Sequence, residues 1–411
     1  MTPDIFANKW AKIALHFLIF SAFAGVILRY YNFTPVAGLN YKFLMHTHSH
    51  VALLGWMHFA ITVALVREFL PGESKKFNNI FLLTLLSVLG MMFSFPFQGY
   101  AFVSIFFSTL FLIASYWFVY DFYKIFKTTA NSSIAAKFLR WALFFLVISS
   151  FGPWALGPIM VFGKSHGTLY NLSVYYYLHF LYNGFFVTAV FGILLKWLDN
   201  RGIKYSGQRA LRFFQFTVYP IIPAYTLSML WINPPIWIYL IAGLAALLQL
   251  LGLYYGWPIL TIYLRNIKNK FFQFIFSLVL IAYSLKLAMQ VFSAYPLIAD
   301  YVYETRMFTA IGYLHLVMLG FLSLFMLTYF IRTNVYRDNS IAQVGLIIFL
   351  AGLLVSEVLL FFNGILLTRT GASIDNYGQW MFLASLLMPI GLTSFWIVQL
   401  RTTTSGNDLT L

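Results

Sequence analysis

Long apolar runs separated by short polar breaks extend along the whole chain. A run of about 20 apolar residues is long enough to cross the hydrocarbon core of a bilayer as an α-helix. The pattern predicts an all-α polytopic membrane protein with one transmembrane domain, residues 1–411. The twelve predicted spans are 10–30, 44–66, 78–98, 101–123, 138–162, 173–197, 211–231, 236–263, 271–295, 307–331, 341–366 and 378–400.

The amino-acid composition supports a membrane protein and leaves little of the chain for any other domain. Of the 411 residues, 61% are hydrophobic and 9% are charged, whereas about 25% charged residues are usual in soluble domains. The spans use almost the whole length, so no extramembrane catalytic domain is expected. The expected surroundings are the lipid bilayer.

The basic residues fall mainly in alternate loops. The formal net charge is +15, and most Lys and Arg residues lie on the side of the predicted bundle that holds both termini. The opposite side carries Arg29, Lys42, Lys164, Arg306 and Arg369. By the positive-inside rule both termini are cytoplasmic. Since no basic stripe lies outside these loops, we expect no nucleic-acid partner.

The absence of cysteine narrows the cofactor chemistry. With no Cys in the chain, disulfides, thiolate metal sites, the usual iron–sulfur clusters and covalently attached c-type haem are excluded. A metal would have to be held by His, Met, Tyr or carboxylate side chains.

Histidines are concentrated in three spans at intervals of four: the second (44–66), the sixth (173–197) and the tenth (307–331). His48, His179 and His315 lie roughly 8 to 12 Å below the outer ends of these spans. A single membrane histidine is usually a hydrogen-bonded packing residue, but three at matched depth favour a shared site. Imidazole is the usual ligand of haem iron where sulfur is absent. Gly55, seven positions after His48, lies on the same helix face and could make room for a flat ring.

Three segments resemble the main subunit of the haem-copper oxidase superfamily, especially its cbb-type oxidase and nitric oxide reductase branches. HSHVALLGW from His48 resembles the segment that binds a haem, and HFLYNGFFVTAVFG from His179 resembles the segment whose His binds a non-haem metal. YLHLVMLG from Tyr313 resembles the segment in which a His-x-His pair serves two haems. The resemblance implies a twelve-helix bundle with a low-spin b-type haem between His48 and His315.

The departures from the family pattern imply that the oxygen-reducing centre is lost. Tyr313 stands where the family has the ligand of the high-spin haem, and the His-His pair expected near 211–231 is absent. Copper or non-haem iron held by His179 alone would lack most of its ligands. Asn183 stands where the nitric oxide reductases carry a Glu, which removes a proton-handling carboxylate. The implied protein is a degenerate member of the superfamily and not a functional terminal oxidase.

The sequence does not decide which histidine of the second span binds the haem or what role Arg29 has. His48 and His50 lie about 200° apart on a helix, so only one can face a given haem. Family spacing favours His48, whereas the NnrS family, twelve-helix haem proteins linked to nitric oxide resistance, would favour His50. Arg29, at the outer end of the first span, either pairs with a haem propionate or is an interfacial arginine.

Lys286 and Glu357 are the charged residues deep inside the predicted spans, at similar depths. We interpret them as a structural ion pair, with a proton or ion path as the alternative. His16, His58 and His166 receive no functional assignment.

The sequence thus favours a haem protein of a bacterial inner membrane that acts in electron transfer, gas or haem sensing, or nitric oxide stress, with other respiratory subunits as candidate partners. A second hypothesis is a transporter or channel lined by Lys286 and Glu357. A third is a haem-free assembly partner of a respiratory complex.

Overall fold

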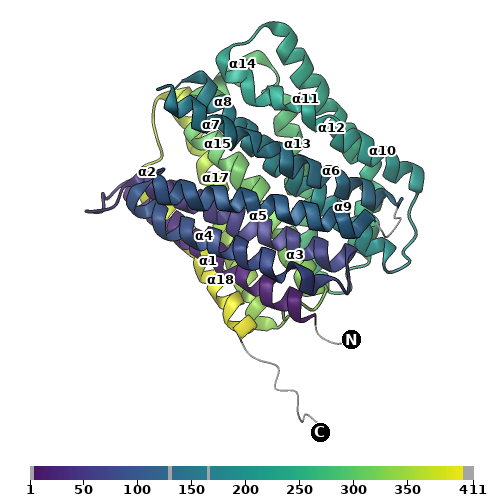
Figure 1. The fold of residues 1–411 in the computed structure, drawn as a ribbon. Helices are drawn as coiled ribbons and strands as arrows, with labels where there is room; N and C mark the ends of the chain where they lie inside the picture. Colours follow the sequence, from purple (N-terminus) through teal and green to yellow (C-terminus); the bar gives the residue numbers. More distant parts are fainter. Residues whose placement is uncertain (1–3, 128–131, 164–166, 401–411) are drawn as a thin grey trace.

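The computed structural model describes residues 4–127, 132–163 and 167–400. In these ranges eleven helices are long and apolar enough to cross a membrane, and together they form one bundle (Figure 1). Eight of these spans surround three inner ones. The surrounding spans are α1 (Ile5–Tyr31), η2 with α4 (Ser74–Phe77 and Asn78–Gln98), α5 (Phe102–Lys127), α6 with α7 (Ile134–Ser149 and Phe151–Val161), α12 (Ile236–Arg265), α13 (Lys270–Ser293), α17 (Ser340–Thr370) and α18 (Tyr377–Leu400).

The three inner spans are the ones that carry the histidines. Their most apolar windows are 78%, 94% and 72% buried within the protein, against 28–50% for the other eight. Each contains a π-helical stretch: the first directly follows His50, the second begins at His179 and the third directly follows His315. π-helical turns often mark functional positions. The inner spans are α2–η1–α3 (Tyr41–His50, Val51–Met57, His58–Phe69), α8–η3–α9 (Thr168–Leu178, His179–Phe186, Val187–Asp199) and α15–η5–α16 (Arg306–His315, Leu316–Ser323, Leu324–Arg332).

The predicted span 211–231 is present as an interrupted helix. It consists of α10 (Gly207–Val218), α11 (Ile221–Ala224) and the 3₁₀ helix η4 (Tyr225–Ile232). Pro220 and Pro223 lack the backbone N–H that a continuous helix needs, which accounts for the breaks. The segment still follows α12 in antiparallel register, since Thr217 faces Gly252 and Tyr239 donates to the carbonyl of Leu230.

The first and last spans pack against each other in opposite directions. Trp396 of α18 donates through Nε1 to Nε2 of His16 in α1, at 3.0 Å. The beginning of α1 and the end of α18 therefore lie at the same end of the bundle (Figure 1). We call this the terminal end, and the other the opposite end. A short helix that the sequence pattern did not predict, α14 (Pro296–Glu304), precedes α15.

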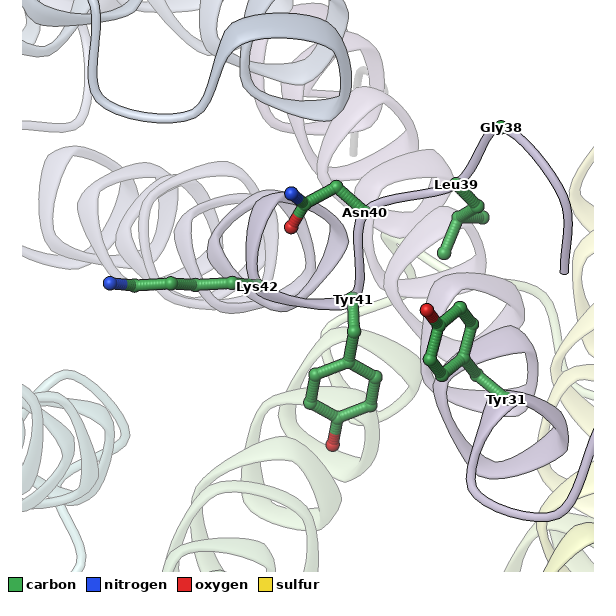
Figure 2. A pocket seen from close by; sticks show the side chains of 6 residues that line it. All are labelled: Tyr31, Gly38, Leu39, Asn40, Tyr41 and Lys42. Atoms are coloured by element: carbon green, nitrogen blue, oxygen red, sulfur yellow. The ribbon is translucent and has the colours of Figure 1, made fainter. Parts of the chain in front are cut away.

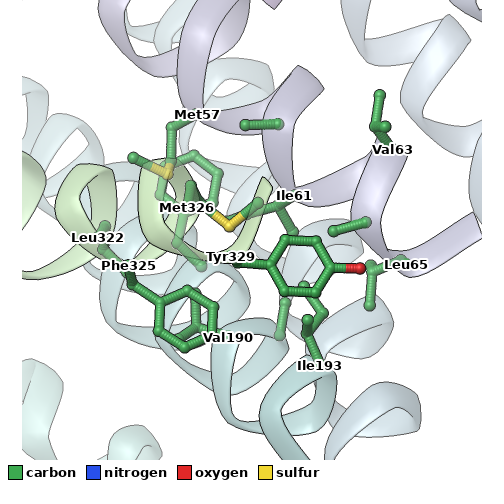
Figure 3. Packing of buried hydrophobic residues seen from close by; sticks show 14 of the residues in the cluster. Met57, Ile61, Val63, Leu65, Val190, Ile193, Leu322, Phe325, Met326 and Tyr329 are labelled. Atoms are coloured by element: carbon green, nitrogen blue, oxygen red, sulfur yellow. The ribbon is translucent and has the colours of Figure 1, made fainter. Parts of the chain in front are cut away.

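The half of the centre nearer the terminal end is filled with apolar side chains from all three inner spans. Ile61 of α3, Ile193 of α9 and Phe325 of α16 meet there, with Tyr329 among them (Figure 3).

Candidate functional site

His48 is held by one ring nitrogen and leaves the other free. Its Nδ1 lies 2.8 Å from the carbonyl oxygen of Ser21 in α1, so Nδ1 carries the proton and donates it. Among the described residues Nε2 has no hydrogen-bond partner. Gly25, one turn after Ser21, allows this approach, because a Cβ there would lie 3.2 Å from Cε1 of His48. The neutral imidazole thus presents a lone pair on Nε2.

His315 has a similar arrangement. Its Nδ1 lies 3.6 Å from Oε1 of Glu357 in α17, and Nε2 has no hydrogen-bond partner in the described part of the chain. The side chain keeps 24% of its surface accessible, although it projects from one of the three innermost helices. Neighbouring side chains therefore leave part of the His315 ring uncovered.

The two histidines lie at the same height. Eight residues after His48, Trp56 donates to the hydroxyl of Ser323, which stands eight residues after His315, at 2.7 Å. The two helices run in the same direction, and each histidine lies eight residues before this contact through a π-helical stretch of similar length, so both lie at a matching height.

His50 has no free ring nitrogen. Nδ1 lies 2.8 Å from the carbonyl of His46, and Nε2 lies 3.0 Å from the hydroxyl of Tyr100. Tyr100 lies between α4 and α5, where burial raises the pKa of its phenol, so the hydroxyl keeps its proton and donates to Nε2. The His50 ring packs against Phe95, with 4.5 Å between ring centroids. These contacts describe a packing histidine.

His179 is also saturated. Its Nε2 lies 2.8 Å from the carbonyl of Ile221, and its Nδ1 lies 3.4 Å from the amide nitrogen of Asn183. Tyr313 lies beside Tyr182 and Asn183 in the same region. The described residues contain no group of three or more His, Cys, Asp or Glu side chains arranged to hold a metal ion.

Arg29 lies near the outer side of the His48–His315 pair. Its charge is within range of Tyr41, Tyr377 and Glu357. The Tyr377 hydroxyl is buried and has no partner. The guanidinium therefore stands beside unsatisfied polar groups at the edge of the site.

Lys286 and Glu357 do not form the expected ion pair. Nζ of Lys286 donates to Oε1 of Gln290 at 3.0 Å and lies 5.9 Å from the ring centroid of Tyr283. Glu357 instead faces His315. The ion-pair interpretation was wrong because similar depth on α13 and α17 does not bring the two side chains onto facing surfaces.

Gly55, which we expected to make room for a flat ring, instead allows close packing between helices. A Cβ there would lie 2.8 Å from the ring of Phe17 and 3.0 Å from Val88. The missing side chain allows close packing against α1 and α4. Gly25, which the sequence did not point to, provides the close approach to His48.

The remaining histidines make ordinary contacts. His16 bonds to the carbonyl of Lys12 as well as to Trp396, and His58 is buried between Phe111 and Phe185 with its Nδ1 lacking a hydrogen-bond partner among the described residues. His166 lies outside the described residues.

A surface hollow of about 540 Å³ lies where α1 ends and α2 begins (Figure 2). It is lined by Tyr31, Gly38, Leu39, Asn40, Tyr41 and Lys42. The hollow lies at the same end of the bundle as the histidine pair, but neither histidine lines it.

No family model matches the sequence, and no curated protein matches it. Among solved structures, the chain is similar to a haem-copper terminal oxidase whose dimer was determined by cryo-electron microscopy. The TM-score is 0.72 at 13% sequence identity, over 96% of this chain and 83% of the other. The chain is therefore an integral membrane protein with the fold of a haem-copper terminal oxidase. At this identity the likeness shows the fold alone.

Proposed function

We propose that the protein is a membrane electron carrier with one b-type haem held between His48 and His315. The observation that carries the proposal is the pair of imidazoles at one height, each with a free Nε2 and with Nδ1 facing a protein acceptor. Metal-binding histidines usually have this arrangement, because the second contact fixes the tautomer and the ring orientation.

The residues present fit a non-covalently bound haem. The chain has no Cys for a thioether link, Gly25 lets the His48 ring lie close against α1, and the side chain of His315 is partly accessible. Arg29 would hold a propionate at the outer edge. When bound, the haem would supply one-electron redox chemistry, with a potential set by its axial ligands.

His48 and His315 would both be engaged in holding the haem. A haem held by two histidines would supply electron transfer rather than gas binding or a nitric oxide role. Reduction of oxygen at a second metal is not expected, because both nitrogens of His179 are bonded to other groups. We place the protein in a bacterial inner membrane with both termini cytoplasmic and with other respiratory subunits as electron donors or acceptors.

The alternatives have less support. An NnrS-type site would need His50 to give up a bond to His46 or Tyr100. A transport path lined by Lys286 and Glu357 would need these side chains to share a passage, whereas they have separate neighbours and the centre is filled with apolar groups towards the terminal end.

The test is a reduced-minus-oxidised absorption spectrum of protein purified after haem-replete expression. We expect a b-type spectrum that disappears in His48→Ala and His315→Ala and persists in His50→Ala and His179→Phe. The last two variants control for the loss of any buried histidine.

A colourless wild-type protein would overturn the proposal and favour the transporter or assembly partner. Loss of the spectrum in His50→Ala with retention in His48→Ala would favour the NnrS-type ligand. Oxygen consumption by the pure protein would contradict a carrier without a second metal.

A further inference from the structure

Glu357 is a buried carboxyl group with no assigned role once the ion pair with Lys286 is set aside. We propose that Glu357 is a positioning residue for His315: its carboxyl oxygen accepts the Nδ1 proton of His315 and thereby lowers the reduction potential of the haem iron. This inference rests on the proposed haem function and goes beyond it.

His315 offers a hydrogen-bond donor and Glu357 offers acceptors, and these atoms have no other hydrogen-bond partners in the described part of the chain. Nδ1 of His315 and both carboxyl oxygens of Glu357 are buried and have no hydrogen-bond partner among the described residues. Oε1 lies 3.6 Å from Nδ1, slightly beyond the 2.7–3.2 Å, roughly, of such a bond. A small side-chain movement would bring Nδ1 and Oε1 within hydrogen-bond distance, and a buried donor and acceptor without partners are unfavourable.

The local packing keeps the carboxyl group at this position. Gly312 stands nearly one turn before His315, and a Cβ there would lie 3.3 Å from Oε2 of Glu357 and 2.9 Å from the ring of Phe361. The glycine therefore lets α17 approach α15 closely enough for Glu357 to reach the histidine. Of the other charged groups, Arg29 acts on Glu357.

The two histidines would then differ as ligands. His48 donates to a neutral backbone carbonyl, whereas His315 would donate to the ionised carboxylate of Glu357, and an ionised acceptor makes the stronger hydrogen bond. A stronger acceptor makes the imidazole more electron-rich, and this stabilises the oxidised iron. Because the two acceptors differ in strength, we assign control of the haem reduction potential to the contact between His315 and Glu357.

The test is a spectroelectrochemical titration at fixed pH of the wild type, Glu357→Gln and Glu357→Leu. We expect the equilibrium constant for one-electron reduction to rise about tenfold in Glu357→Leu, which is about 59 mV for one electron. Glu357→Gln keeps a weaker acceptor and should shift less. Glu304→Gln, which removes an exposed carboxylate before α15, should leave the potential unchanged.

A second readout separates tuning from a structural role. The low-spin electron paramagnetic resonance spectrum of the oxidised protein should change in both Glu357 variants, while haem content stays near that of the wild type. Haem bound normally with an unchanged potential in Glu357→Leu would overturn the inference and leave the proposed function intact. If Glu357→Leu does not fold, an unchanged potential in Glu357→Gln overturns it. Absence of haem from the wild type would instead overturn the proposed function.

Discussion

At the scale of single residues, what distinguishes the histidines is the occupation of each ring nitrogen. His50 and His179 use both nitrogens in bonds to the protein. His48 and His315 turn Nδ1 toward an acceptor and leave Nε2 unpartnered within the described structure. Sequence spacing grouped His48, His179 and His315 by depth, but depth does not report which nitrogen is free. The partner carbonyls of Ser21 and Ile221 belong to other spans, and no local pattern points to them.

Gly25 gives a prediction at the same scale. In Gly25→Ala the added Cβ would lie 3.2 Å from Cε1 of His48, and the ring is tied to Ser21, so it must turn away from its present orientation. We expect about tenfold weaker haem retention, as for other losses of ligand support, with little change in thermal unfolding. Gly243→Ala is the matched control, because its nearest neighbour would be Ala294 at 3.6 Å. Equal haem retention in the two variants would contradict the role of Gly25.

At the scale of helices, the apolar pattern predicted eleven spans that the structure has as continuous helices, within the usual uncertainty of their ends. It did not predict the break in 211–231, although Pro220 and Pro223 were visible there, because mean hydropathy does not report backbone hydrogen bonding. The three π-helical stretches could not be predicted from the sequence either, because the spacing of apolar residues hardly distinguishes a π-helix from an α-helix. Near these stretches a polar contact joins two of the histidine helices, from Trp56 to Ser323.

This contact supports a double-mutant cycle. Trp56→Phe and Ser323→Ala should each lower the free energy of unfolding by about 1 kcal/mol, and the double variant should lose less than the sum, because either change alone breaks the bond. The measurement is denaturant unfolding in detergent for the wild type and the three variants. Strictly additive losses would mean that the two side chains do not interact.

At the scale of the whole molecule, a buried polar network joins the inner spans at the terminal end. Glu68 of α3 accepts from Tyr329 of α16 at 2.7 Å and from Asn200, directly after α9, at 2.9 Å. Arg67 donates to the same carboxylate at 3.0 Å. One carboxylate thus ties together three helices that are separated by more than a hundred residues each. The sequence could not reveal that the partners of Glu68 come from two other spans.

Substitution of Glu68 should therefore weaken the whole bundle and not one helix. Glu68→Ala leaves Arg67 with Asp4 as its acidic partner but removes the acceptor of Tyr329 and Asn200, and each buried donor without a partner costs about 1–3 kcal/mol, so we expect a large fall in the unfolding temperature. The haem spectrum should be unchanged in the folded fraction, because the network and the histidines lie at opposite ends of the inner helices. Glu73→Ala is the control, since its exposed pair with Lys76 at 2.6 Å is worth about 0–1 kcal/mol. Similar unfolding temperatures for the two variants would show that Glu68 does not hold the inner spans together.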